Sequence, residues 1–106
     1  MKTEYTQTIL VPNRIAIDIN QYLQAIYPSE YQGKNNILSF STRFPDNMRM
    51  DIRCHGRDDG PSYADAILFD ETETEIRHSP KSDEFFDIWT FVENKTRYNV
   101  IVKIQQ

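Results

Sequence analysis

The chain has 106 residues, of which 39% are hydrophobic and 12% are aromatic, so it is long enough and apolar enough to form one domain with a real core. Its formal net charge of −4 and its pI near 5.1 argue against direct binding of nucleic acid, because that needs an excess of basic side chains. We therefore expect a single domain, residues 1–106, that does not bind nucleic acid itself.

The composition also bears on the cellular compartment. No apolar run follows Lys2 as it would in a secretory signal, and no stretch approaches the length of a membrane span. Cys54 is the only cysteine and so forms no internal disulfide, which suits a reducing environment. These features predict a cytoplasmic protein with no membrane contact.

The N-terminal part predicts a strand followed by an amphipathic helix. Residues 6–11 form the predicted strand, and Pro12-Asn13 ends it. The helix is predicted from the spacing of five apolar residues: Ile15, Ile19, Tyr22, Leu23 and Ile26. Pro28 stops it. Its start is open between Asn13 and Asp18, because Asp18 with Gln21 fits a capping box.

Two strands with clear alternation are predicted next. In residues 38–44 every second side chain is apolar or Thr42, and in residues 48–54 the alternation of apolar and charged side chains is the clearest in the chain. The first set is Leu38, Phe40, Thr42 and Phe44, and the second is Met48, Met50, Ile52 and Cys54. Pro45-Asp46-Asn47 predicts the turn that joins them.

The C-terminal half predicts further strands. Residues 63–70 form one strand, and residues 71–78 either continue it or pair back on it. Residues 85–92 and 97–104 form a hairpin across residues 93–96, with Tyr98, Val100, Val102 and Ile104 facing inward.

These elements predict an α+β fold: a mainly antiparallel sheet of six or seven strands, with the amphipathic helix near the N-terminus packed on one face. Residues 85–92 are apolar on both faces, which predicts a central strand covered on both sides. One short helix covers only one face of such a sheet. Either the sheet curls on itself, or a second chain covers the other face.

Acidic residues are distributed very unevenly. Residues 58–87, which we call the acidic segment, contain ten acidic and two basic residues, a net charge of −8. The flanking residues 1–57 and 88–106 each carry a net charge of +2. Such a segment attracts cationic partners and repels nucleic acid.

The sharpest pattern in this segment is the alternation Glu71, Glu73, Glu75. In an extended strand these carboxylates share one face at a spacing of about 7 Å, not far from the repeat of phosphates along a nucleic-acid strand. The alternative is a solvated edge strand whose glutamates pair with Arg49 and Arg53 of a neighbouring strand.

We therefore expect a small acidic protein that is not an enzyme and needs no cofactor or metal. It would bind a basic protein and block a nucleic-acid-handling enzyme such as a nuclease, as immunity proteins and virus-encoded inhibitors of defence nucleases do. The predicted partner-binding residues are Glu71, Glu73, Glu75, Asp58, Asp59, Asp83, Glu84 and Asp87. The alternative is a structural or assembly protein that homodimerises through an aromatic sheet face.

A third interpretation is an enzyme that uses Cys54, His55 or His78. Adjacent Cys54 and His55 point to opposite faces of a strand, so a thiol–imidazole pair would have to join Cys54 to His78. Because Cys54 alternates in phase with Met50 and Ile52, we expect it to be a buried core residue. No spacing typical of a zinc or calcium site is present.

Overall fold

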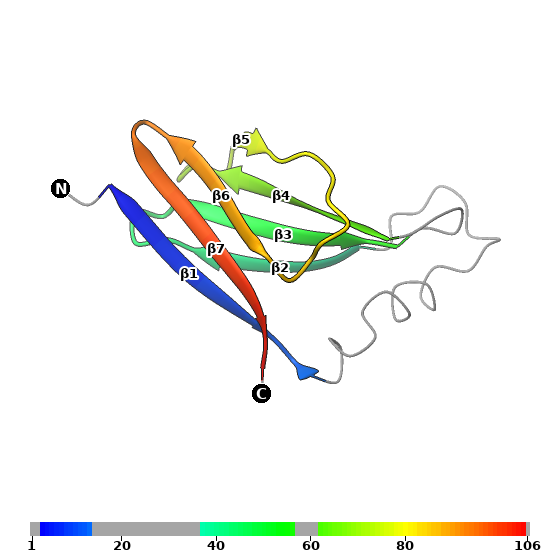
Figure 1. Ribbon diagram of the computed structural model, residues 1–106. Coiled ribbons are helices and arrows are strands. Elements are labelled where there is room, and N and C mark those ends of the chain that lie inside the picture. The colour runs from blue at the N-terminus through cyan, green and yellow to red at the C-terminus, as the bar shows by residue number, and fades with distance from the viewer. Residues whose placement is uncertain (1–2, 14–36, 57–61, 106) are drawn as a thin grey trace.

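The computed structural model describes residues 3–13, 37–56 and 62–105, and in this part the protein is all-β, with seven strands in two sheets (Figure 1). The strands are β1 (Glu4–Val11), β2 (Ile37–Arg43), β3 (Arg49–His55), β4 (Tyr63–Phe69), β5 (Glu75–His78), β6 (Ile88–Glu93) and β7 (Thr96–Ile104). The helix expected over residues 15–26 lies outside the described residues. Within them, no helix is long and apolar enough to cross a membrane.

The strands divide between a three-stranded sheet with the order β1-β7-β6 and a four-stranded antiparallel sheet with the order β2-β3-β4-β5. The expectation of one sheet is therefore wrong. In the three-stranded sheet β1 runs parallel to β7, in register from Glu4 with Arg97 to Val11 with Ile104. Alternation along a strand is the same whichever sheet it joins, so the pattern specified the strands and not their partition.

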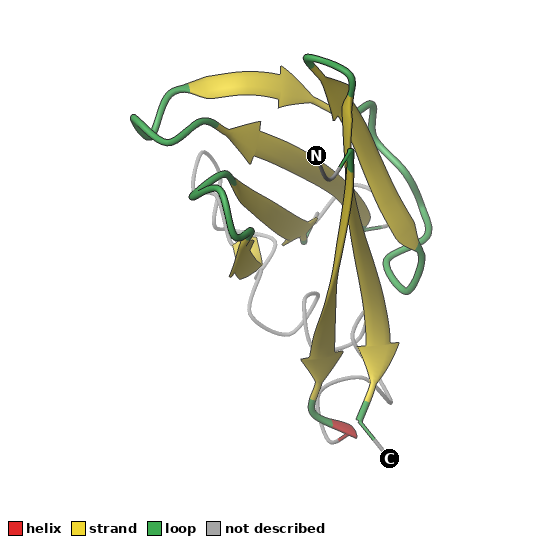
Figure 2. Ribbon diagram, turned by 90° about the vertical axis from the view of Figure 1, so that its left-hand side faces the viewer, coloured by secondary structure: helices red, strands yellow, loops and turns green. Residues whose placement is uncertain are grey.

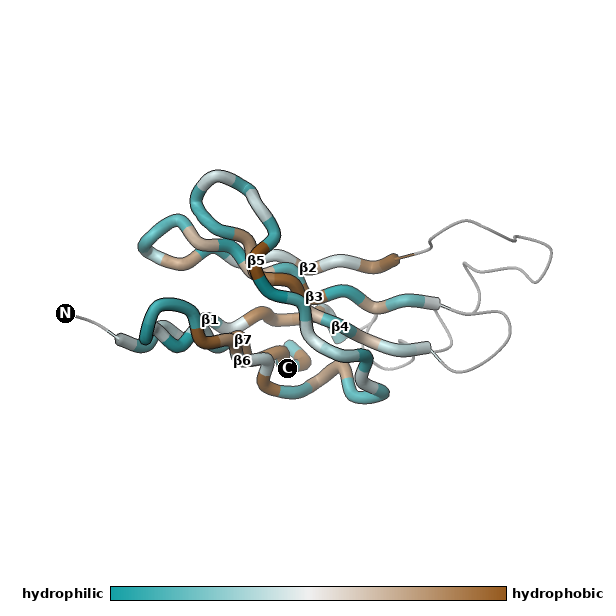
Figure 3. The backbone as a smooth tube through the Cα atoms, turned by 90° about the horizontal axis from the view of Figure 1, so that it is seen from above, coloured by the Kyte–Doolittle hydropathy of each residue, from teal (hydrophilic) through white to brown (hydrophobic). Residues whose placement is uncertain are grey.

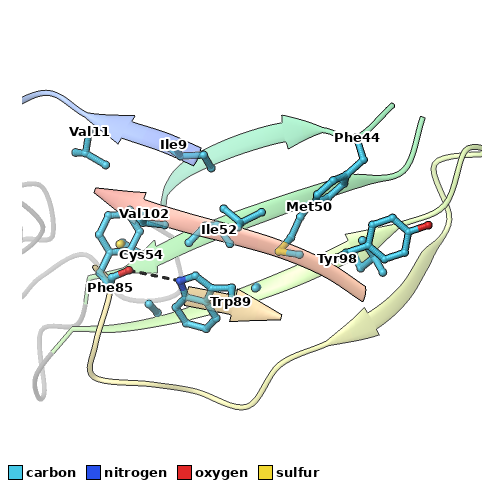
Figure 4. Close-up of a cluster of buried hydrophobic side chains, with 14 of the residues drawn as sticks. Ile9, Val11, Phe44, Met50, Ile52, Cys54, Phe85, Trp89, Tyr98 and Val102 are labelled. Carbon is cyan, nitrogen blue, oxygen red and sulfur yellow. Dashed lines mark hydrogen bonds between the residues drawn. The ribbon is translucent and has the colours of Figure 1, made fainter. Parts of the chain in front are cut away.

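The two sheets pack face to face as two layers (Figures 2 and 3). Met50, Ile52 and Leu68 of the four-stranded sheet and Val11 and Val100 of the three-stranded sheet are fully buried between them. Figure 4 shows Phe44, Phe85, Trp89 and Tyr98 in the same cluster. The second sheet of the same chain supplies the cover that the apolar strands need.

Most predicted strands are confirmed. β2 and β3 pair as antiparallel neighbours around the expected turn, in which Asn47 has a φ of 67°. The hairpin β6–β7 is also confirmed, with Tyr98, Val100 and Val102 buried and Ile104 packed against the core. Residues 75–78 pair back on β4, which was one of the two alternatives for that segment.

The prediction of a central strand over residues 85–92 is wrong. The strand begins at Ile88 and lies at the edge of its sheet, and its Ile88 and Val92 side chains are 58% and 51% exposed. Phe85 lies in the connection that precedes the strand, and its side chain is buried in the core. Its backbone carbonyl accepts a hydrogen bond from Trp89 Nε1 at 3.4 Å. The apolar residues 85–92 thus belong to two different elements: a connection whose Phe85 fills the core, and an edge strand with one buried face.

The aromatic side chains do not form an exposed face of either sheet in the described residues. The aromatic side chains of residues 85–92, together with Phe40, Phe44 and Tyr98, pack in the common core or against it. The outer face of the three-stranded sheet instead exposes aliphatic side chains: Leu10, Ile88 and Val92.

The turn of the β6–β7 hairpin is formed by Asn94 and Lys95, whose φ angles of 50° and 64° are both positive. Two consecutive positive φ angles match the twist of the flanking strands, as in a type I′ turn. Both side chains have a Cβ that contacts the backbone in this conformation, but the short polar side chain of asparagine can compensate by hydrogen bonding locally, whereas that of lysine does not.

We expect Lys95→Gly to raise the free energy of unfolding by about 0.5–1 kcal/mol, because relief of the left-handed strain exceeds the extra entropy of glycine in the unfolded chain. Urea titration followed by circular dichroism measures the change. Lys95→Ala removes the same charge but keeps the Cβ, so it is the control and should give no gain. Equal stabilisation by both substitutions would contradict the strain argument.

Candidate functional site

The outer face of the four-stranded sheet carries most of the described ion pairs. Alternation along β3 buries Met50, Ile52 and Cys54 and turns the intervening side chains outward. The outward side chains of β3 are Arg49, Asp51, Arg53 and His55. Antiparallel register places Arg53 opposite Asp65 and His55 opposite Tyr63 on β4.

Asp65 is the centre of this face, and it is only 4% exposed. Arg53 binds its carboxylate with two donors: Nε lies 2.8 Å from Oδ1 and Nη2 lies 2.6 Å from Oδ2. His55 Nε2 lies 3.0 Å from Oδ1, and His78 Nε2 of β5 lies 2.7 Å from Oδ2. We call Arg53, His55, Asp65 and His78 the Asp65 cluster.

The protonation of Asp65 follows from two opposing effects. Burial by itself raises the pKa of this carboxyl, but the hydrogen bonds from Arg53, His78 and His55 outweigh it and hold the pKa well below its usual range. In return, the hydrogen bond to Asp65 raises the pKa of Arg53 against the effect of its own burial. The cluster therefore contains an ionised carboxylate and a charged guanidinium.

The geometry of the Asp65 cluster is that of a structural network. Each imidazole directs its Nε2 at the carboxylate, and the His55 ring stacks on Tyr63 with centroids 4.4 Å apart. Both carboxylate oxygens already accept a hydrogen bond from Arg53. Among the described residues no group of histidine, cysteine and acidic side chains could hold a metal ion.

Cys54 lies on the opposite face from this cluster. It is buried in the core as expected, and burial, helped by the negative charge of Asp65, raises the pKa of its thiol. Because His78 belongs to the Asp65 cluster on the outer face, the pair Cys54–His78 does not form. A thiol that is both buried and neutral is a poor nucleophile.

The predicted row of carboxylates at Glu71, Glu73 and Glu75 is not formed. Residues 70–74 make the turn between β4 and β5, closed by a hydrogen bond from Asp70 N to Thr74 O at 2.9 Å. The Asp70 carboxylate accepts hydrogen bonds from the Thr72 hydroxyl and from the backbone N–H groups of Thr74 and Thr72, and these bonds, that of the hydroxyl above all, lower its pKa. Glu73 has a φ of 65°, so the three glutamates do not share one face of a strand. Aspartate binding its own backbone favours a turn over an extended strand here.

Glu73 is neutralised within the molecule. Arg43 Nη2 lies 2.9 Å from its Oε1, and Arg49 also forms an ion pair with it. These contacts, the hydrogen bond from Arg43 above all, lower the pKa of Glu73. The alternative in which arginines of the neighbouring strand pair with the glutamates is thus confirmed for Arg49, whereas Arg53 binds Asp65.

The other acidic residues form two groups at the two ends of the β5 edge. Glu71 and Glu75 lie beside the β4–β5 turn, with Glu75 paired to Phe69, whereas Ser82 bridges to Ala64 immediately before the second group. The second group is Asp83, Glu84 and Asp87. Ala64 and Phe69 are five positions apart on β4, so the two backbone positions beside which the groups begin are about 17 Å apart. Asp87 lies farther along, where its carbonyl accepts a hydrogen bond from Val102 N of β7. Asp58 and Asp59 lie outside the described residues.

These carboxylates differ from the rest in their surroundings. Glu71, Glu75, Asp83 and Glu84 are exposed and make no ion pair within residues 62–105 or the other described ranges. Asp87 is also exposed, and its Oδ1 accepts the backbone N–H of Ile88 at 2.8 Å. By contrast, Asp51, Asp65, Glu73 and Glu93 are all paired with arginine.

Asp65 was not among the functional residues predicted from the sequence, although it is one of the ten acidic residues counted in the acidic segment. A signal was present: Asp65 is the one charged residue within the apolar stretch Tyr63–Phe69. A charge inside a buried strand requires a partner, and an arginine on the adjacent strand is the best candidate. Only the register of β3 against β4 identifies that arginine as Arg53.

Comparisons with known proteins identify no relative of this chain: no protein-family model, no curated protein and no solved structure matches it.

We expect Asp65→Asn to lower the free energy of unfolding at pH 7 by about 3 kcal/mol, because it leaves a partly buried arginine without its counter-charge. The pKa of Asp65 is lower in the folded state than in the unfolded state. Its contribution to the free energy of unfolding is therefore complete above the unfolded-state pKa of about 4 and is lost as the pH falls below that value. The difference between wild type and variant should therefore shrink in acid. Urea titrations from neutral to acidic pH measure it.

Asp51→Asn is the matched control. Asp51 lies on the same face and pairs with Arg49 at 3.0 Å, but its side chain is 20% exposed. We expect a loss of no more than about 1 kcal/mol. Equal losses from the two substitutions, or a pH-independent loss at Asp65, would contradict the central position of the Asp65 cluster.

Proposed function

We propose that this protein binds a basic protein through the exposed carboxylates of the acidic segment, and that it thereby inhibits a nucleic-acid-handling enzyme, such as a nuclease. The proposal is carried by one observation. The carboxylates on the outer face of the four-stranded sheet are paired with arginine, whereas those at the two ends of the β5 edge are exposed without an ion pair among the described residues.

The charge pattern supports recognition of a cationic surface. Unpaired exposed carboxylates keep their full charge and hydration, so they raise the rate of encounter with a basic partner and repel nucleic acid. Arg43, Arg49 and Arg53 are occupied by Glu73, Asp51 and Asp65 and therefore do little to offset this field.

The spacing of the two acidic groups supports the same proposal. The β4 positions beside which they begin are about 17 Å apart, close to the axial rise of about five base steps in a duplex. The basic groove of a nucleic-acid enzyme presents cations over such a length. Glu71 and Glu75 would contact one part of the groove, and Asp83, Glu84 and Asp87 would contact another.

The test is inhibition of purified basic enzymes, namely a ribonuclease, a deoxyribonuclease and a restriction endonuclease, at low and high salt. We expect inhibition of at least one of them that weakens as salt rises, because exposed charges are screened. The variant Glu71→Gln/Glu75→Gln/Asp83→Asn/Glu84→Gln should raise the inhibition constant about tenfold, since four exposed charge contacts contribute roughly 0.3–0.5 kcal/mol each.

The control is Lys95→Gln/Lys103→Gln, which removes exposed positive charge from the other sheet and leaves the acidic segment intact. It should inhibit at least as well as wild type. Inhibition that is unaffected by the acidic substitutions or by salt would contradict the proposal. So would a panel in which no enzyme is inhibited.

A further inference from the structure

β6 is an edge strand, and the direction of its free backbone groups follows from its pairing with β7. Val102 N donates to Asp87 O at 3.1 Å, which makes Asp87 and Val102 a hydrogen-bonded pair immediately before the strand. Such pairs alternate along an antiparallel ladder, so Trp89, Phe91 and Glu93 also bond to β7. The backbone groups of Ile88, Thr90 and Val92 therefore point away from β7.

This outer edge of β6 has open donors and acceptors. Asp87 Oδ1 accepts the Ile88 N–H, but no hydrogen bond within the described ranges uses the N–H of Thr90 or Val92, or the carbonyl groups of Ile88, Thr90 and Val92. The side chains of Ile88, Thr90 and Val92 are exposed on the outer face of the sheet.

The edge also lacks the usual protection against pairing. Residues 88–92 contain no charge and no proline, and all five favour extended structure. The four-stranded sheet has two edge strands: β5 exposes Glu75, Arg77 and His78, and β2 carries the charged Arg43 at its end. An uncharged, β-favouring edge with open backbone groups fits an added strand.

We propose that the occupant is β6 of a second copy of this chain, paired antiparallel about a two-fold axis at Thr90. In this register the two Thr90 residues exchange two hydrogen bonds, and each Val92 N–H donates to the Ile88 carbonyl of the other copy. In the same pair the Ile88 N–H leaves the Asp87 carboxylate, which it binds in the single chain, and donates to the Val92 carbonyl of the other copy. The two three-stranded sheets become one continuous sheet of six strands.

The side chains fit this register. Ile88 of each copy lies opposite Val92 of the other, so both exposed aliphatic side chains gain an apolar neighbour. Ile101 pairs with Ile88 within each copy and so extends the apolar strip by one residue. Beside it lies a shallow hollow whose remaining lining is polar or charged: Glu4, Thr6, Arg97 and Asn99. On the inner side Asp87 faces Glu93 of the other copy, and Arg77 compensates this contact because its Nη2 lies 2.7 Å from Glu93 Oε2.

β1 is the other edge of the same sheet, and it is the less suitable of the two. It begins with the charged Glu4 and carries Thr6 and Thr8 at its exposed positions. An antiparallel β1–β1 pairing centred on Gln7, which uses the full length of the strand, would place Glu4 near the exposed Leu10 of the other copy.

Analytical ultracentrifugation of the full chain over roughly 5–500 µM tests the proposal, since small edge interfaces dissociate in this range. We expect wild type to form a dimer, and Thr90→Lys to be monomeric because it places two ammonium groups opposite each other at the axis. Thr8→Lys makes the same change on the outer face of β1 and should leave the dimer intact. Circular dichroism and urea titration establish that both variants are folded.

Amide hydrogen exchange of the wild type identifies the interface. The N–H groups of Thr90 and Val92 should become protected as the dimer forms, whereas in a dimer that stacks through the outer face they would stay exposed to water. A monomeric wild type, a dimer lost in Thr8→Lys, or a dimer in which Thr90 and Val92 exchange freely would each overturn the proposal. The result is independent of nuclease inhibition, because it is measured on the protein alone.

Discussion

The mutual burial of the inner faces of the two sheets is the constraint on which the rest of the structure depends. Each sheet has one apolar face, and neither is stable in water without the other. The packing fixes which alternate residues of every strand lie inside, Met50, Ile52 and Cys54 on β3 among them. It therefore also fixes which side chains are left outside. The charges of the four-stranded sheet lie on its outer face because the inner positions are filled by the core.

The outer face of the four-stranded sheet is itself an organised layer. Asp65 is almost inaccessible although it lies on this face, because Arg53, His55 and His78 cover it from the two neighbouring strands. Farther along, Glu73 joins Arg43 and Arg49 above the β4–β5 turn. These contacts neutralise the arginines of β2 and β3. The unpaired negative charge of the acidic segment therefore lies at its exposed turns and connections and not on the face of the sheet. The proposed binding surface is defined by this contrast.

The edge strands β5 and β6 differ in the charge of their exposed side chains. The edge of the four-stranded sheet at β5 carries charges, and the connection after it crosses to β6 while burying Phe85 in the core. At the β6 edge of the three-stranded sheet, residues 88–92 contain neither a charged residue nor proline. Edge strands of soluble proteins usually carry protective features, and the absence of charge and proline from residues 88–92 supports the proposal that a second chain pairs with this edge. The proposed acidic site and the proposed β6 interface meet at Asp87, which belongs to the second acidic group and directly precedes β6.

The sequence by itself determined the strands with clear alternation, β2, β3 and β7, the turns between them, the burial of Cys54 and the concentration of negative charge in residues 58–87. These features depend on the periodicity and composition of short stretches of sequence, which can be seen without knowledge of the fold. Only the tertiary structure decided the division into two sheets, the parallel pairing of β1 with β7, the edge position of β6, and the partners of Asp65 and Glu73. The physical reason is that alternation tells which face a residue occupies, whereas pairing depends on contacts between residues far apart in the chain. The turn at Asp70 shows the same limit: alternating glutamates favoured a strand, but hydrogen bonds from the backbone to the Asp70 carboxylate made a turn.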